Sequence, residues 1–513
     1  MIFKSPFPDF PIPQHLDTVS FLFDNLTEVE KLKTALIDQK NGLKLNYSEF
    51  VNKINSISNG LLKNLKLNKW DVVGIWSPNH IDYISAVYGI VRAGLTVTTA
   101  NPSYHIDEIV YQLKDSNAKA LITHKSIYKD ALNAAAMLNI PRERIFIFGE
   151  EKIENVNRLS DLFVNSSDFV KPNFSLEELN SKPAFLMYSS GTTGRSKGVK
   201  TSHVNMIANL LQANVVEKSD VKEGDCFLGI LPIYHSYGLG YILPGAFINR
   251  ISIVICEKFE LKSFLETFEK YKITKAHIVS SAAPLGLEIS KELYRILKVP
   301  VKQGYGMTEL SPNSHGTRSS HIVDGSFGVL APNMRARVVD VETGKDLGYN
   351  QEGELLLKGP NVMIGYLNNE KATKETIVDG WLHTGDIVKV DEGGNYFIVD
   401  RLKELIKYKG FQVAPAELEA LILTHPAVAD TAVVPLEQEM AGEVPRAYVV
   451  LKPGFCATEK DIKDFVSSRV ANFKSLRGGV VFVDVIPKSP SGKILRRVLR
   501  LQAIEETKVY SKL

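Results

Sequence analysis

The sequence predicts an α/β protein with a large N-terminal domain of parallel α/β sheets, a small β-rich part of that domain, and a small α+β C-terminal domain. Three observations support this prediction. From about Asn46 onward, helix-period and strand-like segments alternate, which is typical of a parallel sheet covered by helices. Near residue 320 short strands and glycine turns take over, and after residue 400 short helices and strands are mixed. We therefore expect one domain over residues 1–400, with its β-rich part at about 320–400, and a second over residues 401–513.

The alternation in the first domain follows the spacing of its apolar residues. Ile54, Ile57, Leu61 and Leu65 recur at intervals of three and four, which predicts a helix. Short apolar runs predict buried strands, and the stretches between them predict the covering helices. The expected strands are 72–76, 95–98, 120–123, 144–148 and 184–188, and the expected helices are 81–91, 106–113, 131–138 and 202–214.

The second domain is predicted to begin with a helix opened by Pro415, because proline is favoured in a first helical turn. A later helix from Asp461 has a capping box with Thr458. Strands are expected at 431–434, 447–451 and 480–484, and a polar basic loop follows them.

Composition indicates an ordinary soluble protein. The 513 residues are 44% hydrophobic and 23% charged, which is enough for two or more domains with buried cores. The net charge of +3 gives no strong field, so neither nucleic acid nor an anionic membrane is indicated as a partner. Cys226, Cys256 and Cys456 are far apart, form no disulfide or metal pattern, and suit a reducing compartment. We expect no signal peptide and no membrane span.

The chain ends in Ser511-Lys512-Leu513, a tripeptide that peroxisomal import receptors read at a free carboxyl terminus. The sequence therefore predicts delivery to the peroxisome, with the import receptor as a partner. The alternative is that the tripeptide is an accidental solvated tail.

Residues 188–200 are rich in glycine, hydroxyl side chains and cations, a composition that suits a polyphosphate site. The glycines allow tight turns whose N–H groups converge on anionic oxygens, while hydroxyls and a lysine add donors and charge. The candidate nucleotide-binding residues are Ser189, Ser190, Gly191, Thr192, Thr193, Gly194 and Lys197. A Walker A loop is excluded because Gly198 follows Lys197, where that motif has serine or threonine. A flexible linker is the alternative, but the expected strand before the loop and helix after it favour an anion site.

Further motifs follow in the order Gln303-Gly-Tyr-Gly-Met-Thr-Glu309, Gly380-Trp-Leu-His-Thr-Gly-Asp386, Asp400-Arg-Leu-Lys403 and Pro487-Lys-Ser-Pro-Ser-Gly-Lys493. With the loop at 188–200 they resemble the adenylate-forming enzymes, a superfamily of acyl-CoA synthetases, peptide-synthetase adenylation domains and beetle luciferases. The nearest resemblance is to 4-coumarate:CoA ligase-like proteins, and it covers nearly the whole chain. It implies an AMP-binding ligase that uses ATP, Mg2+ and CoA. In this family an acid attacks the α-phosphorus of ATP to form an acyl-adenylate and pyrophosphate, and a thiol then displaces AMP.

The resemblance assigns roles in the first half-reaction. Lys493 would reach the carboxylate and α-phosphate oxygens, Thr308 would donate to the α-phosphate, and Glu309 would hold the magnesium ion. His235 matches the histidine that related ligases place beside the acyl carboxylate. Taken without the family, Lys493 would belong to a solvated basic tail and His235 would be a core histidine.

The same resemblance implies contacts to nucleotide and CoA. Asp386 would accept hydrogen bonds from both ribose hydroxyls, Arg401 would make a second ribose or phosphate contact, and Tyr305 would stack on adenine. Lys407 and Gly410 lie in a stretch that resembles the face turned inward for the second half-reaction, with Gly410 leaving room for the pantetheine arm. Lys403 matches the hinge, and rotation about it would bring either Lys493 or the Lys407 face to the site. Without the family, Asp386 would be a turn residue and Lys407 a surface charge.

One segment departs from the family pattern. Val279 is followed directly by Ser280-Ser-Ala-Ala-Pro-Leu-Gly286, where relatives have a further helix, a polar connection and another strand, roughly 20 to 30 residues. Ser281 also stands where relatives often have glycine. In the family this part helps to wall the acyl pocket, and its loss would leave a void and unpaired backbone groups.

Three interpretations therefore stay open. The first is an ATP-dependent acid:CoA ligase with a reshaped pocket, acting on an aromatic, cinnamate-like acid or a medium- or long-chain fatty acid. The second is a catalytically impaired, nucleotide-binding isoform. An incorrectly joined coding sequence would give the same amino-acid sequence. The third is a luciferase-like oxygenase acting on the acyl-adenylate. By resemblance, the pocket would be lined by Ser236, Tyr237, Gly238, Gln303, Met307 and Ser311.

Overall fold

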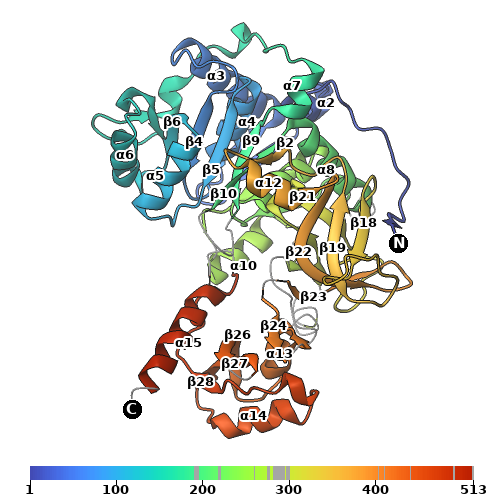
Figure 1. Ribbon diagram of the computed structural model, residues 1–513. Helices are drawn as coiled ribbons and strands as arrows, with labels where there is room; N and C mark the ends of the chain where they lie inside the picture. The colour runs from blue at the N-terminus through green and yellow to red at the C-terminus, as the bar shows by residue number, and fades with distance from the viewer. Residues whose placement is uncertain are drawn as a thin grey trace.

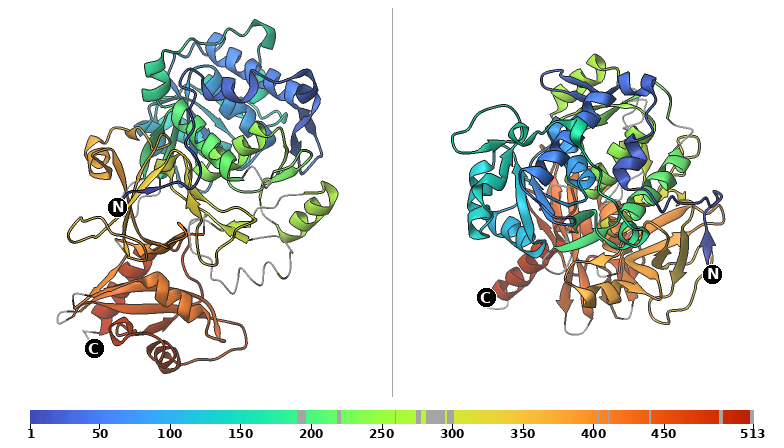
Figure 2. Two further views of the ribbon diagram at one scale, coloured as in Figure 1. Left: turned by 90° about the vertical axis from the view of Figure 1, so that its right-hand side faces the viewer. Right: turned by 90° about the horizontal axis from the view of Figure 1, so that it is seen from above.

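The computed structural model describes residues 1–189, 196–217, 221–258, 260–273, 278–280, 295, 301–402, 404–409, 411–438, 441–488 and 492–510. Figure 1 shows a large body above, which contains the N-terminus, and a smaller body below, which contains the C-terminus. The chain passes from one to the other after β23 (Tyr396–Arg401), and the left view of Figure 2 shows the same two bodies from the side. The predicted α/β fold, with a large N-terminal and a smaller C-terminal domain, is confirmed.

One sheet of the large domain has the strand order β20-β10-β9-β5-β4-β6-β7-β8. Its strands are β4 (Val72–Trp76), β5 (Thr96–Ala100), β6 (Ala118–Thr123), β7 (Ile145–Ile147), β8 (Asn157–Arg158), β9 (Phe185–Ser189), β10 (Lys197–Thr201) and β20 (Gly365–Tyr366). Neighbouring strands from β8 to β9 are parallel, as the alternation predicts. Helices α4 (Ile81–Arg92), α5 (Ile106–Asp115) and α6 (Tyr128–Met137) connect successive parallel strands.

Strand β10 begins inside the stretch predicted as a phosphate loop, residues 188–200, and was not predicted. The helix predicted over 202–214 is present, and it follows this strand. Lys197–Thr201 pairs antiparallel with β9, and helix α8 (His203–Glu217) begins only after β10. Two features of this stretch fit a strand. Val199 is fully buried in the sheet, and Gly198 lies so close to Tyr188 on β9 that an added Cβ would be 3.0 Å from the Tyr188 ring. The loop therefore joins two neighbouring strands.

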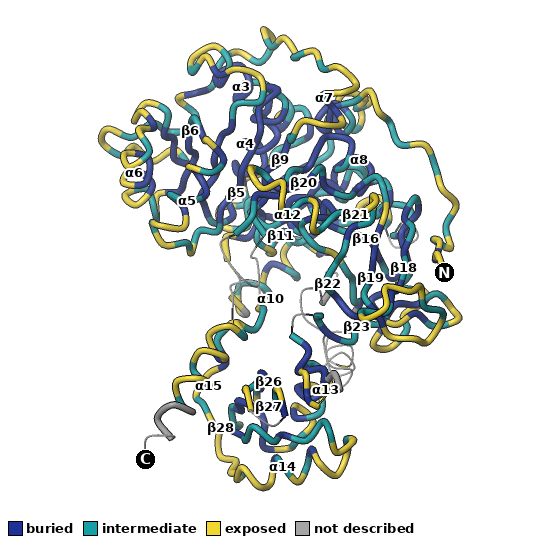
Figure 3. The backbone as a smooth tube through the Cα atoms, in the orientation of Figure 1, coloured by how far each residue is buried: buried dark blue, intermediate teal, exposed yellow. Residues whose placement is uncertain are grey.

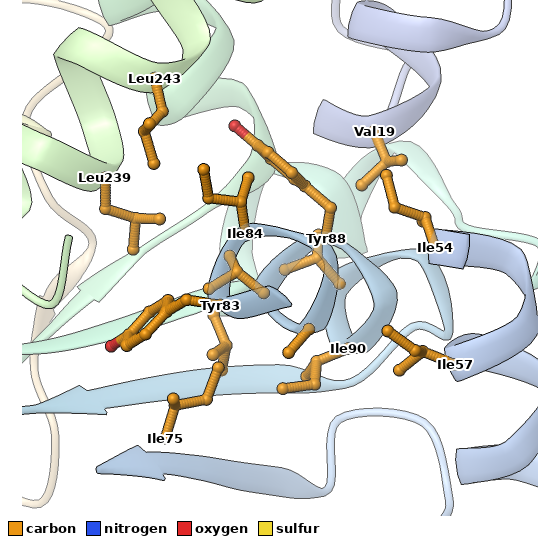
Figure 4. Close-up of a cluster of buried hydrophobic side chains, with 14 of the residues drawn as sticks. Val19, Ile54, Ile57, Ile75, Tyr83, Ile84, Tyr88, Ile90, Leu239 and Leu243 are labelled. Carbon is orange, nitrogen blue, oxygen red and sulfur yellow. The ribbon is translucent and has the colours of Figure 1, made fainter. Parts of the chain in front are cut away.

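A second sheet has the order β11-β12-β2-β3. Its strands are β2 (Thr34–Asp38), β3 (Lys44–Asn46), β11 (Cys226–Gly229) and β12 (Ser252–Ile255). Helices α3 (Tyr47–Lys63) and α9 (Leu243–Ile248) contribute to the core between the elements of this domain. Figure 4 shows Ile54 and Ile57 of α3 facing Tyr88 and Ile90 of α4. The helix predicted from the apolar spacing is confirmed.

The β-rich part has the sheet order β1-β18-β19-β22-β21, with β23 also paired to β22. Its strands are β1 (Phe3–Lys4), β18 (Arg335–Val339), β19 (Gly353–Lys358), β21 (Ile377–Val378) and β22 (Trp381–Val390). A smaller antiparallel sheet contains β15 (Tyr305–Gly306), β16 (Asn313–Gly316) and β17 (Val329–Leu330), and helix α12 is Glu370–Thr376. The first strand of the chain is thus an edge strand of this late part, through the pair Phe3 and Ala336.

The C-terminal domain packs helices on a sheet of order β25-β24-β27-β26, with β28 paired to β27. Its elements are β24 (Ile406–Tyr408), β25 (Phe411–Val413), α13 (Pro415–Leu423), β26 (Val428–Gln438), β27 (Gly442–Leu451), α14 (Glu459–Ser467), β28 (Val480–Phe482) and α15 (Arg496–Tyr510). The capping box of Thr458 is present. The polar loop predicted after β28 is followed by helix α15, which was not predicted. Leu499 and Ala503 of this helix are buried against β26, and its arginines obscure this apolar face in the sequence pattern.

The remaining elements are mostly short and belong to the large domain, except for the helical turn η7 (Asn472–Lys474) in the C-terminal domain. The others are α1 (Thr18–Phe23), α2 (Glu28–Leu32), α7 (Leu176–Ser181), α10 (Leu261–Lys270), β13 (Ile278–Ser280), β14 (Val301–Gln303), η1 (Arg142–Arg144), η2 (Leu159–Leu162), η3 (Ser166–Asp168), η5 (Gly238–Ile242) and η6 (Thr308–Leu310). Figure 3 shows buried segments inside both bodies and exposed ones around them. Within the described ranges, no helix has both the length and the apolar character needed to cross a membrane.

The segment after Val279 is only partly described. β13 pairs in parallel with β14, but residues 281–294 and 296–300, which include Ser281, lie outside the described part. The predicted loss of a helix and a strand here stays a prediction. The same holds for Ser511-Lys512-Leu513, which also lies outside the described residues.

Candidate active site

Strand pairing brings Asp386 and Arg401 together. Asp386 on β22 lies opposite Arg401 on β23, and Arg401 Nε is 3.3 Å from Asp386 Oδ1. The Tyr305 hydroxyl donates a 2.6 Å hydrogen bond to Asp386 Oδ2. Burial raises the pKa of Asp386, while Arg401 and the Tyr305 hydroxyl act in the opposite direction. The result is a buried carboxylate held by a cation and a phenol, with lone pairs left for the hydroxyls of a ligand.

The ring of Tyr305 packs against two other aromatic side chains of the large domain, Phe327 and His315. Its centroid is 4.8 Å from that of Phe327, and His315 meets it edge-on at 5.7 Å. The next residue, Gly306, has to be small because a Cβ there would lie 2.4 Å from the carbonyl oxygen of Pro312. A tightly packed turn therefore fixes the position of the Tyr305 ring.

Tyr366 links two residues that the sequence marked separately. Its hydroxyl donates a 2.8 Å hydrogen bond to Glu309 Oε1, and the Lys197 ammonium lies 4.1 Å from its ring centroid. Glu309 is buried, at 6% exposure, so this hydrogen bond fixes one of its two oxygens. Tyr366 was not predicted as a site residue, because nothing local in Gly365-Tyr366 shows that β20 pairs with β10, the strand that begins at Lys197.

Thr308 and Glu309 lie on the short helical turn η6. The main chain of this turn is held by Asn361, whose amide donates to the carbonyls of Leu310 at 2.8 Å and Asn313 at 2.7 Å. Met363 N–H also donates to the Glu309 carbonyl at 2.8 Å. Half-buried Thr308 is thus presented by a rigid turn.

Lys493 of the C-terminal domain is half-buried among charged groups of the large domain. Burial lowers the pKa of its ammonium and the Arg401 guanidinium lowers it further, while Asp386 and Glu309 act in the opposite direction. Electrostatics therefore couple this lysine to the constellation of Asp386, Arg401 and Glu309 across the domain boundary. The sequence-based alternative of a solvated basic tail is therefore wrong for Lys493.

His235 faces the same constellation. Burial lowers the pKa of His235 to about 4, and the Lys493 ammonium contributes to this lowering. Its Nδ1 accepts a 3.3 Å hydrogen bond from Tyr237 N–H, so the neutral ring carries its proton on Nε2. A neutral imidazole beside an ammonium suits contact with a carboxylate.

The sequence analysis also missed the residues that hold the His235 segment. Asn79, just after β4, accepts from Ile233 N–H at 2.8 Å and donates to the Leu231 carbonyl at 3.0 Å. Thr99 of β5 donates to the Tyr234 carbonyl at 2.7 Å. These side chains belong to a different part of the sequence, and only the sheet brings them to His235.

Lys407 lies away from this constellation. It is exposed on β24, and its backbone N–H donates a 2.9 Å hydrogen bond to Glu443 Oε2 of β27. Ser189, at the end of β9, pairs with Lys197 and so marks one end of the phosphate loop. The predicted site residues that fall outside the described part are Ser190, Gly191, Thr192, Thr193, Gly194, Lys403 and Gly410.

The donor set around Glu309 limits what metal it could hold. Across the described residues, no group of three or more His, Cys, Asp or Glu side chains is placed to bind a metal ion. A single carboxylate fits Mg2+, which proteins often bind through one or two carboxylates together with the phosphates of a substrate.

Comparison with known proteins places the chain in a family. The family described as AMP-binding enzyme matches residues 23–282 and 275–367, and its C-terminal domain family matches residues 417–493. The chain is 37% identical over 542 positions to 4-coumarate–CoA ligase 1 of Petroselinum crispum, covering 98% of this chain and 96% of the relative. It is 39% identical over 493 positions to "Probable 4-coumarate--CoA ligase 3" of Dictyostelium discoideum, covering 88% and 89%.

Solved structures agree with this placement. ATP-bound MatB from Rhodopseudomonas palustris matches with a TM-score of 0.84 and 27% identity, covering 95% of this chain and 99% of that one. The anthranilate CoA ligase AuaEII in complex with anthranoyl-AMP matches with a TM-score of 0.85 and 25% identity, covering 98% and 99%. The chain therefore belongs to the AMP-binding enzyme family, and within the adenylate-forming superfamily it is an AMP-forming acid:CoA ligase of the 4-coumarate–CoA ligase-like type.

Proposed function

We propose that the enzyme activates an aromatic, cinnamate-like acid with ATP and then transfers the acyl group to CoA. In the first half-reaction a carboxylate oxygen attacks the α-phosphorus, the bond to the β-phosphate oxygen breaks, and pyrophosphate leaves. In the second, the CoA sulfur attacks the acyl carbon and AMP leaves. The observation that supports this proposal best is that buried charges of the large domain, Arg401 and Asp386, act on Lys493, while Lys493 in turn acts on His235.

In the first half-reaction, Lys493 would neutralise charge shared by the carboxylate and the α-phosphate. Negative charge grows at the α-phosphate as the new bond forms, so a cation and a hydroxyl fixed there favour the transition state over the substrates. Thr308, on its rigid turn, would supply that hydroxyl. Neutral His235 would donate through Nε2 to the acid and orient it for attack.

The nucleotide would bind through groups that are already in place. Asp386, fixed by Arg401 and the Tyr305 hydroxyl, would accept from the ribose hydroxyls. The Tyr305 ring, backed by Phe327, would offer its other face to adenine. Because these groups are held before ATP arrives, little ordering is needed on binding.

Glu309 would hold a magnesium ion together with the phosphates of ATP. When bound, this ion supplies positive charge against the phosphates and orients the pyrophosphate leaving group. The residues of this chain contribute by fixing Glu309: the Tyr366 hydroxyl occupies Oε1 and leaves Oε2 for other contacts.

The second half-reaction would use the other face of the C-terminal domain. Rotation about Lys403 would withdraw Lys493 and bring Lys407 and Gly410 toward the acyl-adenylate. The exposure of Lys407 supports this proposal, since a residue used only after rotation lies outside beforehand.

The test is pyrophosphate release from ATP by the purified protein across a panel of cinnamic acids and of fatty acids from six to sixteen carbons, with and without CoA. Release with cinnamic acids, followed by AMP and acyl-CoA when CoA is present, is the expected result. Release only with fatty acids would replace the aromatic substrate class. The names of the relatives, 4-coumarate–CoA ligases and an anthranilate CoA ligase, favour the aromatic class.

A second candidate is a nucleotide-binding protein with impaired catalysis. The family matches in two stretches, residues 23–282 and 275–367, that meet near Val279, and the alignment with the Petroselinum crispum enzyme spans 542 positions although this chain has 513 residues. The first observation favours a break in the family pattern near Val279, and the second favours a segment in the relative that this chain lacks. ATP binding by a folded, monodisperse sample that releases no pyrophosphate with any acid would support this candidate, and sequencing a transcript across the junction would exclude an incorrectly joined coding sequence.

Delivery to the peroxisome stays a prediction from Ser511-Lys512-Leu513. A fluorescent fusion at the N-terminus, with and without Leu513, tests it. Import that continues without Leu513 would show that the tripeptide is not the address.

A further inference from the structure

In the Lys493 segment, residues 492–495, the chain on the C-terminal side of Lys493 is anchored to residues that precede it. Ile494 forms an antiparallel bridge with Lys488, and Leu495 N–H donates a 2.8 Å hydrogen bond to the Pro487 carbonyl. Directly after it, Arg496 begins helix α15. The reach of Lys493 into the large domain therefore depends on what holds these positions to the body of the C-terminal domain.

Arg496 makes ion pairs with two different elements. Its Nη1 lies 2.7 Å from Glu404 Oε2, one residue beyond the predicted hinge Lys403, and its Nη2 lies 2.6 Å from Glu419 Oε2 on helix α13. All three side chains are at most 17% exposed. The guanidinium group thus connects the end of the Lys493 segment both to the hinge region and to α13. A lysine, with its single ammonium nitrogen, cannot bridge two carboxylates in this way.

A second ion pair, between Lys488 and Asp430, also holds this segment, but it is more exposed to solvent. Lys488 Nζ lies 2.6 Å from Asp430 Oδ2 of β26, but these side chains are 39% and 31% exposed. Exposed ion pairs contribute little because water and salt screen them, whereas losing one partner of a buried pair leaves an uncompensated charge. Arg496 is therefore the dominant anchor of the segment.

We propose that Arg496 is a positioning residue for adenylate formation: by bridging Glu404 and Glu419 it fixes the start of α15 so that Lys493 reaches the site beside His235 and Asp386. This inference rests on the proposed function of Lys493. Burial raises the pKa of Glu419 to about 7, and Arg496 acts against that rise, so the pair depends on its arginine to stay ionised. Without Arg496, Glu419 takes up a proton and neither carboxylate holds the segment.

The test compares Arg496→Gln with a matched control, Arg446→Gln. Arg446 also forms a buried ion pair within this domain, with Glu506 of α15 at 2.5 Å and exposures of 10% and 24%, but not at the Lys493 segment. Arg496→Gln should slow acid-dependent pyrophosphate release by about 10- to 100-fold, because small misplacements of a catalytic group cost that much. Thioester formation from supplied acyl-adenylate should stay within about twofold of wild type, since Lys493 is withdrawn in that half-reaction. Arg446→Gln should leave the ratio of the two half-reactions unchanged.

A second measurement does not need an active enzyme. Labelling by an amine-reactive acetylating ester, read by mass spectrometry, compares half-buried Lys493 with exposed Lys407 in the same molecule. Because burial slows the labelling of Lys493 while its lowered pKa speeds it, the expected result is a ratio of Lys493 to Lys407 labelling that is the same in the wild type and in Arg446→Gln. In Arg496→Gln the two lysines should react at similar rates, and Arg496→Lys should lie between, because lysine can hold only one of the two carboxylates.

The outcomes separate the two ideas. Wild-type protein that releases no pyrophosphate, yet shows the expected labelling pattern, would overturn the proposed function and leave the positioning role supported. Active wild-type protein whose Arg496→Gln variant adenylates normally would overturn the positioning role. Equal loss of both half-reactions in Arg496→Gln and Arg446→Gln would also overturn it, because a general loss of stability would then explain the effect.

Discussion

Two faces of the C-terminal domain each present a candidate catalytic lysine, and the structure treats them differently. Lys493 is turned toward the large domain, where its pKa responds to burial and to the charges of Arg401, Asp386 and Glu309. Lys407 is exposed on β24, and its backbone N–H is hydrogen-bonded to Glu443 of the same domain. The difference shows that this arrangement of the two domains couples one of the two lysines to the large domain, as the proposed adenylation step requires, and leaves the other at the surface.

Among the described residues, a polar contact and an apolar cluster join the two domains near β23. Asp400, on the large-domain strand β23, accepts a 3.0 Å hydrogen bond from Ala416 N–H in the first turn of α13. A small apolar cluster of Ile387, Leu405 and Ala414 lies beside it. A carboxylate at a helix N-terminus contributes about 0.5–2 kcal/mol, so a substrate could supply the energy to change the arrangement.

The largest effect is expected from Lys493→Ala. It should reduce acid-dependent pyrophosphate release by about 100-fold or more, because it removes a preorganised cation from the developing charge. Thioester formation from supplied acyl-adenylate should continue, as measured by acyl-CoA formation with CoA in excess. Equal loss of both half-reactions would show that the two faces do not alternate.

The converse change, Lys407→Ala, should slow thioester formation from supplied acyl-adenylate by about 10-fold and leave pyrophosphate release unchanged. Lys409, also exposed on the same stretch, offers a neighbouring control. If Lys407→Ala and Lys409→Ala behave alike, the effect belongs to general surface charge and the outer face has no assigned role.

Asp386→Asn tests the inner site alone, through ATP binding and not through either chemical step. The amide keeps an acceptor for the Tyr305 hydroxyl but leaves Arg401 without its charged partner. Hydrogen bonds to charged groups contribute about 1.5–3 kcal/mol, so the KM for ATP should rise by about 10- to 100-fold. The KM for CoA should not change, and a parallel rise in both would contradict a ribose-specific role.

The smallest effect concerns the stability of the fold and not the reaction, and it tests a buried histidine that packs against the site. Burial lowers the pKa of His315, beneath Tyr305, from 6.5 to about 3. Between pH 6.5 and pH 3 the unfolded chain binds a proton here that the folded chain does not, so the free energy of unfolding falls as pH falls through this window. Above pH 6.5 the group makes no difference.

Replacing His315 by Gln should remove this one-proton contribution. Urea unfolding measured between pH 7 and pH 5 should show a smaller dependence of the unfolding free energy on pH in the variant. The slope should fall by about 1.4 kcal/mol per pH unit at pH values where His315 is protonated in the unfolded chain and neutral in the folded one. An unchanged slope would mean that His315 is accessible to protons in the folded protein.

Much of the fold could be predicted from local patterns, and two errors show where such patterns stop. The strands and helices of the parallel sheet follow apolar periodicity, which is a local property. β10 was missed because its extended structure depends on pairing with β9 and β20, and α15 because arginines obscured its single buried stripe. Both elements are stabilised mainly by partners distant in the sequence.

The candidate site divides in the same way. By itself the sequence determined which residues are candidates for the chemistry, since Lys493, Asp386, Glu309 and His235 stand in recognisable motifs. Only the tertiary structure decided which lysine faces the site and which unmarked side chains fix it, namely Tyr366, Asn79 and Arg496. The physical reason is that motif residues contact a ligand of constant chemistry, whereas their supports act through cross-strand pairing and domain orientation, which no short stretch of sequence encodes.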